Sequence, residues 1–127
     1  MRAIDTNALV RLIVRDDLEQ VRAAEAFTAG GAWVSHLVLA ETIWVLDAAY
    51  ERSTAQIATA LDMLLNHKDL TVQDAEVVAS ALEQFRRRPA LGFTDCLVLE
   101  IARKAGHVPL GTFDRDLARL DGAQRLK

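Results

Sequence analysis

Short apolar runs alternate with amphipathic segments along the whole 127-residue chain. Extended runs are expected at residues 1–4, 32–35, 70–72, 108–112 and 123–126. Helical periodicity and capping residues predict helices at residues 8–14, from 16–17 to 29, at 37–49, 53–65, 74–88 and 94–105, and a short one near 117. Because strands that alternate with helices favour crossover connections, the pattern predicts a parallel sheet flanked by helices on both faces. We expect residues 1–127 to form one α/β domain, and the pattern does not specify its strand order.

Composition narrows the class of protein. With 51% hydrophobic and 26% charged residues, the chain is ordinary for a soluble globular domain. The single cysteine excludes an internal disulfide and a cysteine-rich zinc cluster, and it fits the reducing cytoplasm. No export signal or membrane span is expected, because the most apolar run, residues 34–46, is interrupted by His36 and Glu41. A net charge of −3 argues mildly against a nucleic-acid binder that works by bulk charge, but leaves local basic strips open.

Acidic residues recur where predicted strands end or the next helix begins. Asp5 follows the first run, Glu41 lies in the helix after the second, Asp95 opens a later helix, and Asp114 and Asp116 follow a late strand. The carboxyl ends of parallel strands share one edge of a sheet, so these acids are expected to converge there. The alternative for Asp5 is structural, because Asp is a preferred helix N-cap and a good helical sequence follows it.

Glu41 is the most informative single residue. Its neighbours at helical spacing are Leu37, Val38, Trp44 and Val45, which predict that Glu41 lies on a buried apolar stripe. An ionised carboxylate in such a place costs several kcal/mol unless a cation or hydrogen bonds compensate. A purely structural role leaves that cost unexplained.

Carboxylates that converge repel one another and raise each other's pKa, which favours binding of a hard divalent cation, Mg²⁺ or Mn²⁺. Such a metal can lower the pKa of a bound water and neutralise charge on a transferring phosphoryl group. The acids therefore predict phosphodiester hydrolysis by a metal-activated water. Motifs of other chemistries are absent, because the chain has no G-x-S-x-G, no Walker loop and no G-x-G-x-x-G.

Several reactive or aromatic residues are more simply interpreted as structural. Cys96 lies in a helix with apolar partners and is expected to be a core thiol. His36 follows the second strand and could reach the site, but the three histidines lack metal-ligand spacing. Trp33 and Trp44 lie within apolar patterns and are expected in the core.

Basic residues that begin on the helix after Asp5 form a ladder. Arg11, Arg15 and Arg22 could border the pocket and contact RNA phosphates, or form a solvated helix face. The sequence does not separate these two alternatives.

Four short motifs together resemble one family. They are Ile4-Asp5-Thr6-Asn7, Ser35 to Glu41 with Leu46 behind it, Gly92-Phe93-Thr94-Asp95 followed by Leu97, and Thr112-Phe113-Asp114-Arg115-Asp116-Leu117. In order and in a chain of this length, they resemble the PIN-domain ribonucleases, and within these the VapC toxins of bacterial and archaeal toxin–antitoxin pairs. The resemblance covers essentially the whole chain.

The resemblance implies roles for individual residues. Asp5, Glu41, Asp95 and Asp114 would form the Mg²⁺ or Mn²⁺ site of an endoribonuclease, with Asp116 as a possible further ligand and Thr6, Asn7 and Thr112 as hydrogen-bonding supports. Asp114 and Asp116 both fit the fourth motif, and we expect Asp114 to be the closer ligand. The family also implies a homodimer, for which Trp44, Leu61, Leu64 and Leu65 could supply an apolar patch, and a small cognate antitoxin whose tail enters the acidic groove. The RNA that is cut is left open.

Two other functions fit part of the pattern. A phospho-acceptor domain also gathers acids and Mg²⁺ at strand ends, but it would want a lysine in the late strand at residues 108–112, which has none. In a non-catalytic interaction domain the acids would be helix caps. That suits Asp5, Asp95 and Asp114 better than Glu41.

Overall fold

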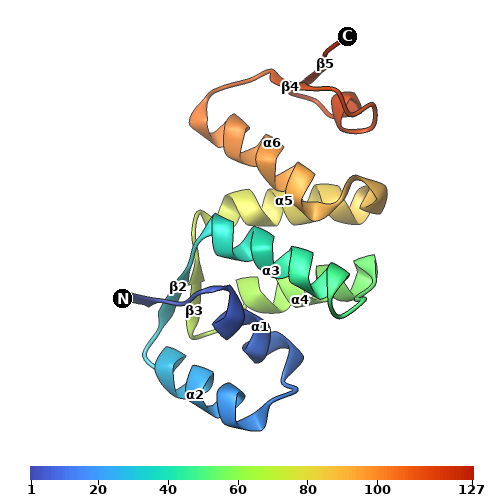
Figure 1. Cartoon of the computed structure of the whole chain (residues 1–127). Coiled ribbons are helices and arrows are strands. Elements are labelled where there is room, and N and C mark those ends of the chain that lie inside the picture. Colours follow the sequence, from blue (N-terminus) through green and yellow to red (C-terminus); the bar gives the residue numbers. More distant parts are fainter. The chain divides into compact units, whose positions relative to one another are not determined.

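The computed structural model describes all 127 residues as two compact units, Met1–Ala75 and Glu76–Lys127. Figure 1 shows both, coloured along the chain. Six α-helices and five short strands make up the chain, and every strand pair is parallel. The α/β class with parallel strands is therefore confirmed. No helix is long and apolar enough to cross a membrane.

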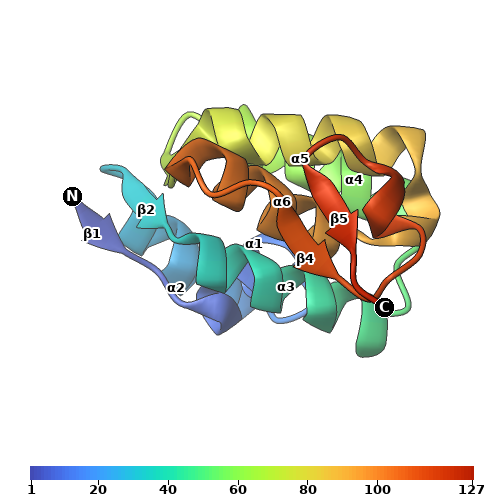
Figure 2. The same cartoon turned by 90° about the horizontal axis from the view of Figure 1, so that it is seen from above.

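The first unit is a three-stranded parallel sheet connected by pairs of helices. Its elements are β1 (Arg2–Ala3), α1 (Thr6–Val14), α2 (Leu18–Thr28), β2 (Ala32–Val34), α3 (His36–Ala48), α4 (Thr54–Leu65) and β3 (Leu70–Val72). The strand order is β1-β2-β3, with Ala3 opposite Trp33 and Trp33 opposite Thr71. Figure 2 shows β1 and β2 running side by side in the same direction. Each strand thus ends where a helix begins, as the sequence predicts.

Helices of the first unit begin at polar caps. Asp5, Asp17, Ser35 and Ser53 each accept a hydrogen bond from the backbone amide three residues on, at 3.0–3.1 Å. At α4 the Gln56 side chain also accepts from the Ser53 amide, which completes a capping box. These side chains satisfy amides that the helix itself leaves unpaired.

Helix α3 buries a different face from the one that the sequence predicts. Its buried residues are Leu39, Thr42, Ile43 and Leu46, and Glu41 is exposed. The prediction that Glu41 lies on a buried stripe is therefore wrong. The reason is that α3 is apolar on nearly every face, so periodicity alone does not identify the packed one.

Two further expectations about burial in this unit are wrong. Trp33 and Trp44 are 37% and 69% exposed rather than in the core. Trp33 is the outward residue of β2, between the buried Ala32 and Val34. Conversely, Leu61 and Leu64 are in the core of the unit, so they cannot belong to an exposed apolar patch with Trp44. Those leucines form the packed face of the amphipathic α4.

The second unit packs helices beside a two-stranded parallel sheet. Its elements are α5 (Ala75–Arg87), the 3₁₀ helix η1 (Pro89–Leu91), α6 (Phe93–Ala105), β4 (Leu110–Thr112), the 3₁₀ helix η2 (Leu117–Arg119) and β5 (Ala123–Arg125). Strand β4 pairs with β5 so that Leu110 faces Ala123 and Thr112 faces Arg125. In the core of this unit the rings of Phe85 and Phe93 meet edge to face at 6.2 Å.

Two helix starts in the second half of the chain differ from the predicted ones. Asp74 accepts no hydrogen bond from α5 and has a φ of 41°, in the left-handed region, whereas an N-cap residue is normally extended. Gly92 rather than Thr94 precedes α6. Gly92 has a φ of 79°, which a residue without Cβ adopts readily, and this turn starts the helix early. Thr94 and Asp95 therefore both lie in the first turn of α6.

Candidate active site

Asp5 lies between β1 and α1, at the carboxyl end of the strand. Its Oδ1 accepts a hydrogen bond from the Ala8 amide at 3.0 Å, so Asp5 is the N-cap of α1, as the structural alternative predicts. The side chain is exposed and belongs to no ion pair, and its second oxygen has no hydrogen-bond partner. Capping therefore uses only half of the carboxylate, and the other half is open to a ligand.

Thr6 connects the first motif to the second. Its hydroxyl donates a hydrogen bond to Oε2 of Glu41 at 3.1 Å, across 35 residues of sequence. Glu41 has no cationic partner. Thr6 directly follows Asp5 at the start of α1. The hydrogen bond therefore places the residue after Asp5 next to Glu41, in the middle of α3.

Asp95 and Asp114 lie close enough to affect one another in the second unit. Asp95 is half-buried in the first turn of α6, and burial together with the negative charge of Asp114 raises its pKa. Neither carboxylate forms an ion pair. A partly buried carboxylate that also feels the negative charge of another acid is unfavourable without a counterion, so this position is suited to a cation.

The backbone around Asp114 fixes its carboxylate. The Asp114 amide donates to the Thr112 hydroxyl at 3.0 Å, and Oδ1 of Asp114 accepts from the amides of Asp116 and Leu117 at 2.8 and 2.9 Å. The Asp116 carboxylate instead lies 3.8 Å from the Arg119 guanidinium. The geometry therefore distinguishes the two acids of the fourth motif, because Asp114 interacts with another acid and Asp116 with a cation.

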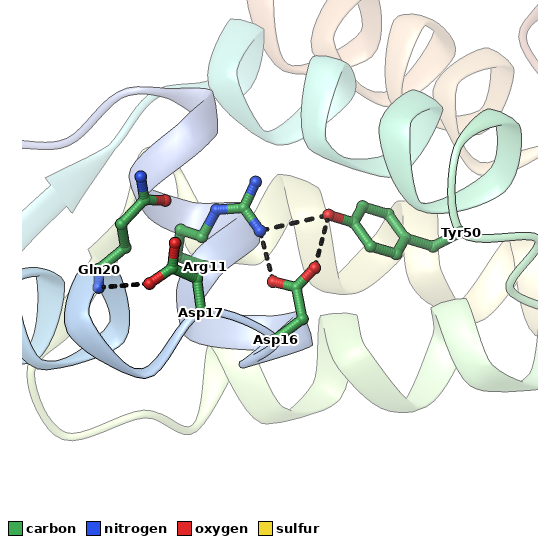
Figure 3. A network of polar contacts seen from close by, with 5 residues as sticks. All are labelled: Arg11, Asp16, Asp17, Gln20 and Tyr50. Carbon is green, nitrogen blue, oxygen red and sulfur yellow. Dashed lines mark hydrogen bonds and ion pairs between the residues drawn. The ribbon is translucent and has the colours of Figure 1, made fainter.

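Two of the three arginines of the predicted ladder, Arg11 and Arg15, are paired with acids of their own unit, whereas Arg22 is exposed and forms no ion pair. Arg11 forms an ion pair with Asp16 and donates to the Tyr50 hydroxyl at 3.3 Å, and Tyr50 in turn donates to Asp16 at 3.3 Å (Figure 3). The Tyr50 hydroxyl and the Asp16 carboxylate raise the pKa of Arg11, which stays charged. Arg15 pairs with Glu25. The paired guanidinium groups are therefore less available to phosphates than unpaired ones would be.

A cavity of about 590 Å³ adjoins Asp5 and contains residues that sequence reasoning missed. It is lined by the end of β1 and by α1 and α2, and Asn7, Arg11, Gln20 and Phe27 are among its lining residues. Gln20 and Phe27 lie on α2, where Arg22 is the only candidate site residue predicted from the sequence. The sequence signal for this cavity would have been the polar Gln20 on the same helix face as the small apolar residues Ala23 and Ala24.

Cys96 is buried in α6 and does not take part in a polar site. Burial, with the negative charges of Asp95 and Glu100, raises the pKa of its thiol to about 11. The thiol is therefore protonated at neutral pH and unsuited to nucleophilic chemistry. The expectation of a core thiol is confirmed.

The donor chemistry fits Mg²⁺ or Mn²⁺. Neither unit by itself gathers three or more His, Cys, Asp or Glu side chains into a metal cluster. In the second unit Asp95 and Asp114 form no ion pair, and Asp114 contributes to the raised pKa of Asp95. In the first unit Asp5 and Glu41 also form no ion pair, as is true of several other acids there. Mg²⁺ commonly binds through one or two carboxylates and keeps several waters, so hard oxygen donors in such pairs suit it.

Comparison with known proteins gives one match. Residues 3–123 match the family model for the PIN domain, a range that includes parts of both compact units and all the acids described above. No curated protein matches the chain. No solved structure matches it.

Proposed function

The chain belongs to the PIN domain family, whose members are generally metal-dependent nucleases, and from this premise we propose that it is an Mg²⁺- or Mn²⁺-dependent endoribonuclease. The observation that carries the proposal is the pair formed by Asp95 and Asp114. Their mutual repulsion has no compensating cation in the protein, and a divalent metal would relieve it.

We assign Asp5, Glu41, Asp95 and Asp114 as the catalytic acids, and Asp5, Asp95 and Asp114 as metal ligands. Asp116 is a weaker candidate ligand, because its carboxylate faces Arg119. Thr6 orients Glu41 by a hydrogen bond, and Thr112 holds the turn that carries Asp114. The Asn7 side chain forms no hydrogen bond within the protein and lies two residues after Asp5, where it can bind substrate or a metal-bound water.

When bound, the metal would supply Lewis acidity toward the phosphodiester and lower the pKa of a bound water. The residues of the chain would orient and neutralise the reacting groups. Asp95 and Asp114 would hold the cation, and the Glu41 oxygen that does not bond to Thr6 would be open to accept a proton. Arg11, beside Asp5 in the cavity, binds phosphate, and Arg15 is available to RNA only when Glu25 releases it.

We propose further that the protein is a VapC-type toxin that acts in the cytoplasm as a homodimer. Its partner is a small cognate antitoxin that blocks the acidic groove. The four motifs in order support this assignment, because they resemble those of the toxins over the length of the chain.

Cleavage of RNA tests the nuclease directly. Purified protein is incubated with total cellular RNA in Mg²⁺ or Mn²⁺, with chelator controls, and new ends are mapped by sequencing. Asp95→Asn and Asp114→Asn should lower the cleavage rate by more than about 100-fold, a larger loss than that usual for outer-shell residues. Asp62→Asn is the matched control, because Asp62 is exposed on α4 and its side chain forms no hydrogen bond or ion pair.

The control should retain the wild-type rate, and Asp116→Asn should lose less than Asp114→Asn. If the wild type and Asp95→Asn give the same ends, the cutting comes from a contaminant and the proposal fails.

A non-catalytic interaction domain is the second candidate. It is favoured by one observation, that Asp5 and Asp114 both accept hydrogen bonds from backbone amides at the starts of helices. This function predicts no RNA cleavage and no effect of metal on the melting temperature.

A further inference from the structure

We propose that the cavity beside Asp5 is a nucleotide-binding subsite, which holds one unpaired nucleotide of the RNA next to the bond that is cut. The cavity has a volume of about 590 Å³, within the range usual for small-ligand sites. Asp5 is one of its walls, so an occupant would lie beside a proposed catalytic acid. That the nucleotide belongs to an RNA substrate rests on the proposed function. That the cavity binds a nucleotide rests on the cavity alone.

The walls of the cavity combine flat apolar surface with a few polar groups. Ala23, Ala24 and Phe27 of α2 supply the apolar part, and Asn7 and Gln20 supply amides. The Phe27 ring is held in place, because the Arg2 guanidinium lies 3.9 Å from its centroid and donates to the Phe27 carbonyl at 2.9 Å. A nucleobase has apolar faces and a polar edge, so its chemistry matches these walls.

Arg11 is fixed in the cavity wall before any ligand binds. One nitrogen of its guanidinium, Nη1, contacts both Asp16 and Tyr50, and its side chain is only 25% exposed (Figure 3). The donors on Nη2 and Nε have no partner. A guanidinium held in this way loses little side-chain freedom when it binds an anion, which favours a phosphate contact.

The two amides of the cavity are free to recognise a base. The Gln20 backbone amide donates to Asp17, so the first turn of α2 fixes where its side chain starts, and Figure 3 shows the side chain extending from that turn. Neither the Gln20 nor the Asn7 side chain forms a hydrogen bond within the protein. An amide offers both a donor and an acceptor, so the pair can distinguish bases by their edges.

Direct binding tests the subsite without any need for activity. The four 5′-mononucleotides AMP, GMP, CMP and UMP are titrated into the full-length protein in the absence of metal, and binding is followed by chemical-shift changes of backbone amides. We expect one or two of the four to bind and to shift the amides of Asn7 and Gln20. Gln20→Ala should weaken that binding at least 5-fold, and Arg11→Met should weaken it for all nucleotides alike.

Gln124→Ala is the matched control, because Gln124 is exposed on β5 in the other unit and should leave nucleotide binding unchanged. Arg11→Met also removes the contacts to Asp16 and Tyr50, so its melting temperature is measured alongside. Gln20→Ala removes no internal side-chain hydrogen bond and keeps the test valid if Arg11→Met unfolds.

RNA cleavage supplies the second readout. Gln20→Ala should reduce the base preference at one position next to the cut at least 3-fold, as mapped by sequencing of the ends. Binding of no mononucleotide, or equal binding of all four that Gln20→Ala does not change, would overturn the subsite. If no RNA is cut but selective binding through Gln20 is seen, the nucleotide subsite stands and the endoribonuclease proposal fails.

Discussion

At Asp95, two unfavourable effects act on one carboxylate. Partial burial removes water from it, and Asp114 places a second negative charge nearby, so the pKa of Asp95 is raised. A purely structural acid is normally stabilised by its surroundings, as Asp16 is by Arg11 and Tyr50. Asp95 lacks such a partner, which is the pattern expected of a residue kept for binding rather than for stability.

The stability of Asp95→Asn should reflect this repulsion. At pH 7 the free energy of unfolding should be unchanged or higher by no more than about 0.5 kcal/mol, because solvent screens a half-exposed pair. Since the folded-state pKa is raised above the ordinary 3.8, the cost is present at pH values above the folded pKa. It decreases as the pH falls through that value and is absent below 3.8.

Urea unfolding of the wild type and Asp95→Asn across this pH range measures the difference, with Asp62→Asn as the control. A variant that is less stable than the wild type by more than about 1 kcal/mol at pH 7 would mean that Asp95 has a structural role.

At the level of elements, sequence patterns predict the existence of helices better than their exact packing. The helices predicted at residues 37–49 and 53–65 are found with Ser35 and Ser53 as their caps, because a capping side chain and the helix start are local to one another. Asp74 and Thr94 do not, because left-handed turns at Asp74 and Gly92 set those helix starts. Strands are also shorter than predicted: residues 108–112 yield only Leu110–Thr112.

Arg103 attaches α6 to the segment before β5. Its Nε lies 3.2 Å from Oε2 of the buried Glu100, and its Nη2 donates to the Asp121 carbonyl at 2.5 Å. Arg103→Met should leave the Glu100 carboxylate without its partner and lower the free energy of unfolding by about 2 kcal/mol. It should also speed hydrogen exchange of the Leu110 amide, which donates to the Gly122 carbonyl at 2.8 Å.

Arg87→Met is the control for this attachment, because Arg87 pairs with Glu83 within α5 on an exposed face, and such pairs contribute little. Equal stability and equal Leu110 exchange in both variants would show that Arg103 does not hold the strand.

For the molecule as a whole, the carboxyl-edge rule for parallel sheets selects candidate acids but does not give their geometry. Within the second unit Asp114 contributes to the raised pKa of Asp95, and within the first the Thr6 hydroxyl donates to Glu41. The convergence of all four acids stays a prediction. Strand order, β1-β2-β3 and β4-β5, depends on contacts between distant segments, which local patterns do not encode. The hydrogen bond from Arg11 to Tyr50 joins residues 39 positions apart, and the sequence could not predict it for the same reason. The PIN domain match spans residues 3–123. That residues 1–127 form a single domain stays a prediction.

The central claim is that Asp95, Asp114 and Asp5 bind a divalent metal, and Mn²⁺ binding measured by electron paramagnetic resonance tests it without RNA. The wild type should bind Mn²⁺ saturably, Mg²⁺ should compete, and Asp5→Asn and Asp95→Asn should each weaken the affinity at least about 10-fold, as loss of a ligand requires. Asp62→Asn should bind as the wild type does. Equal affinity in the wild type and Asp95→Asn, or no saturable binding in the wild type, would contradict the account.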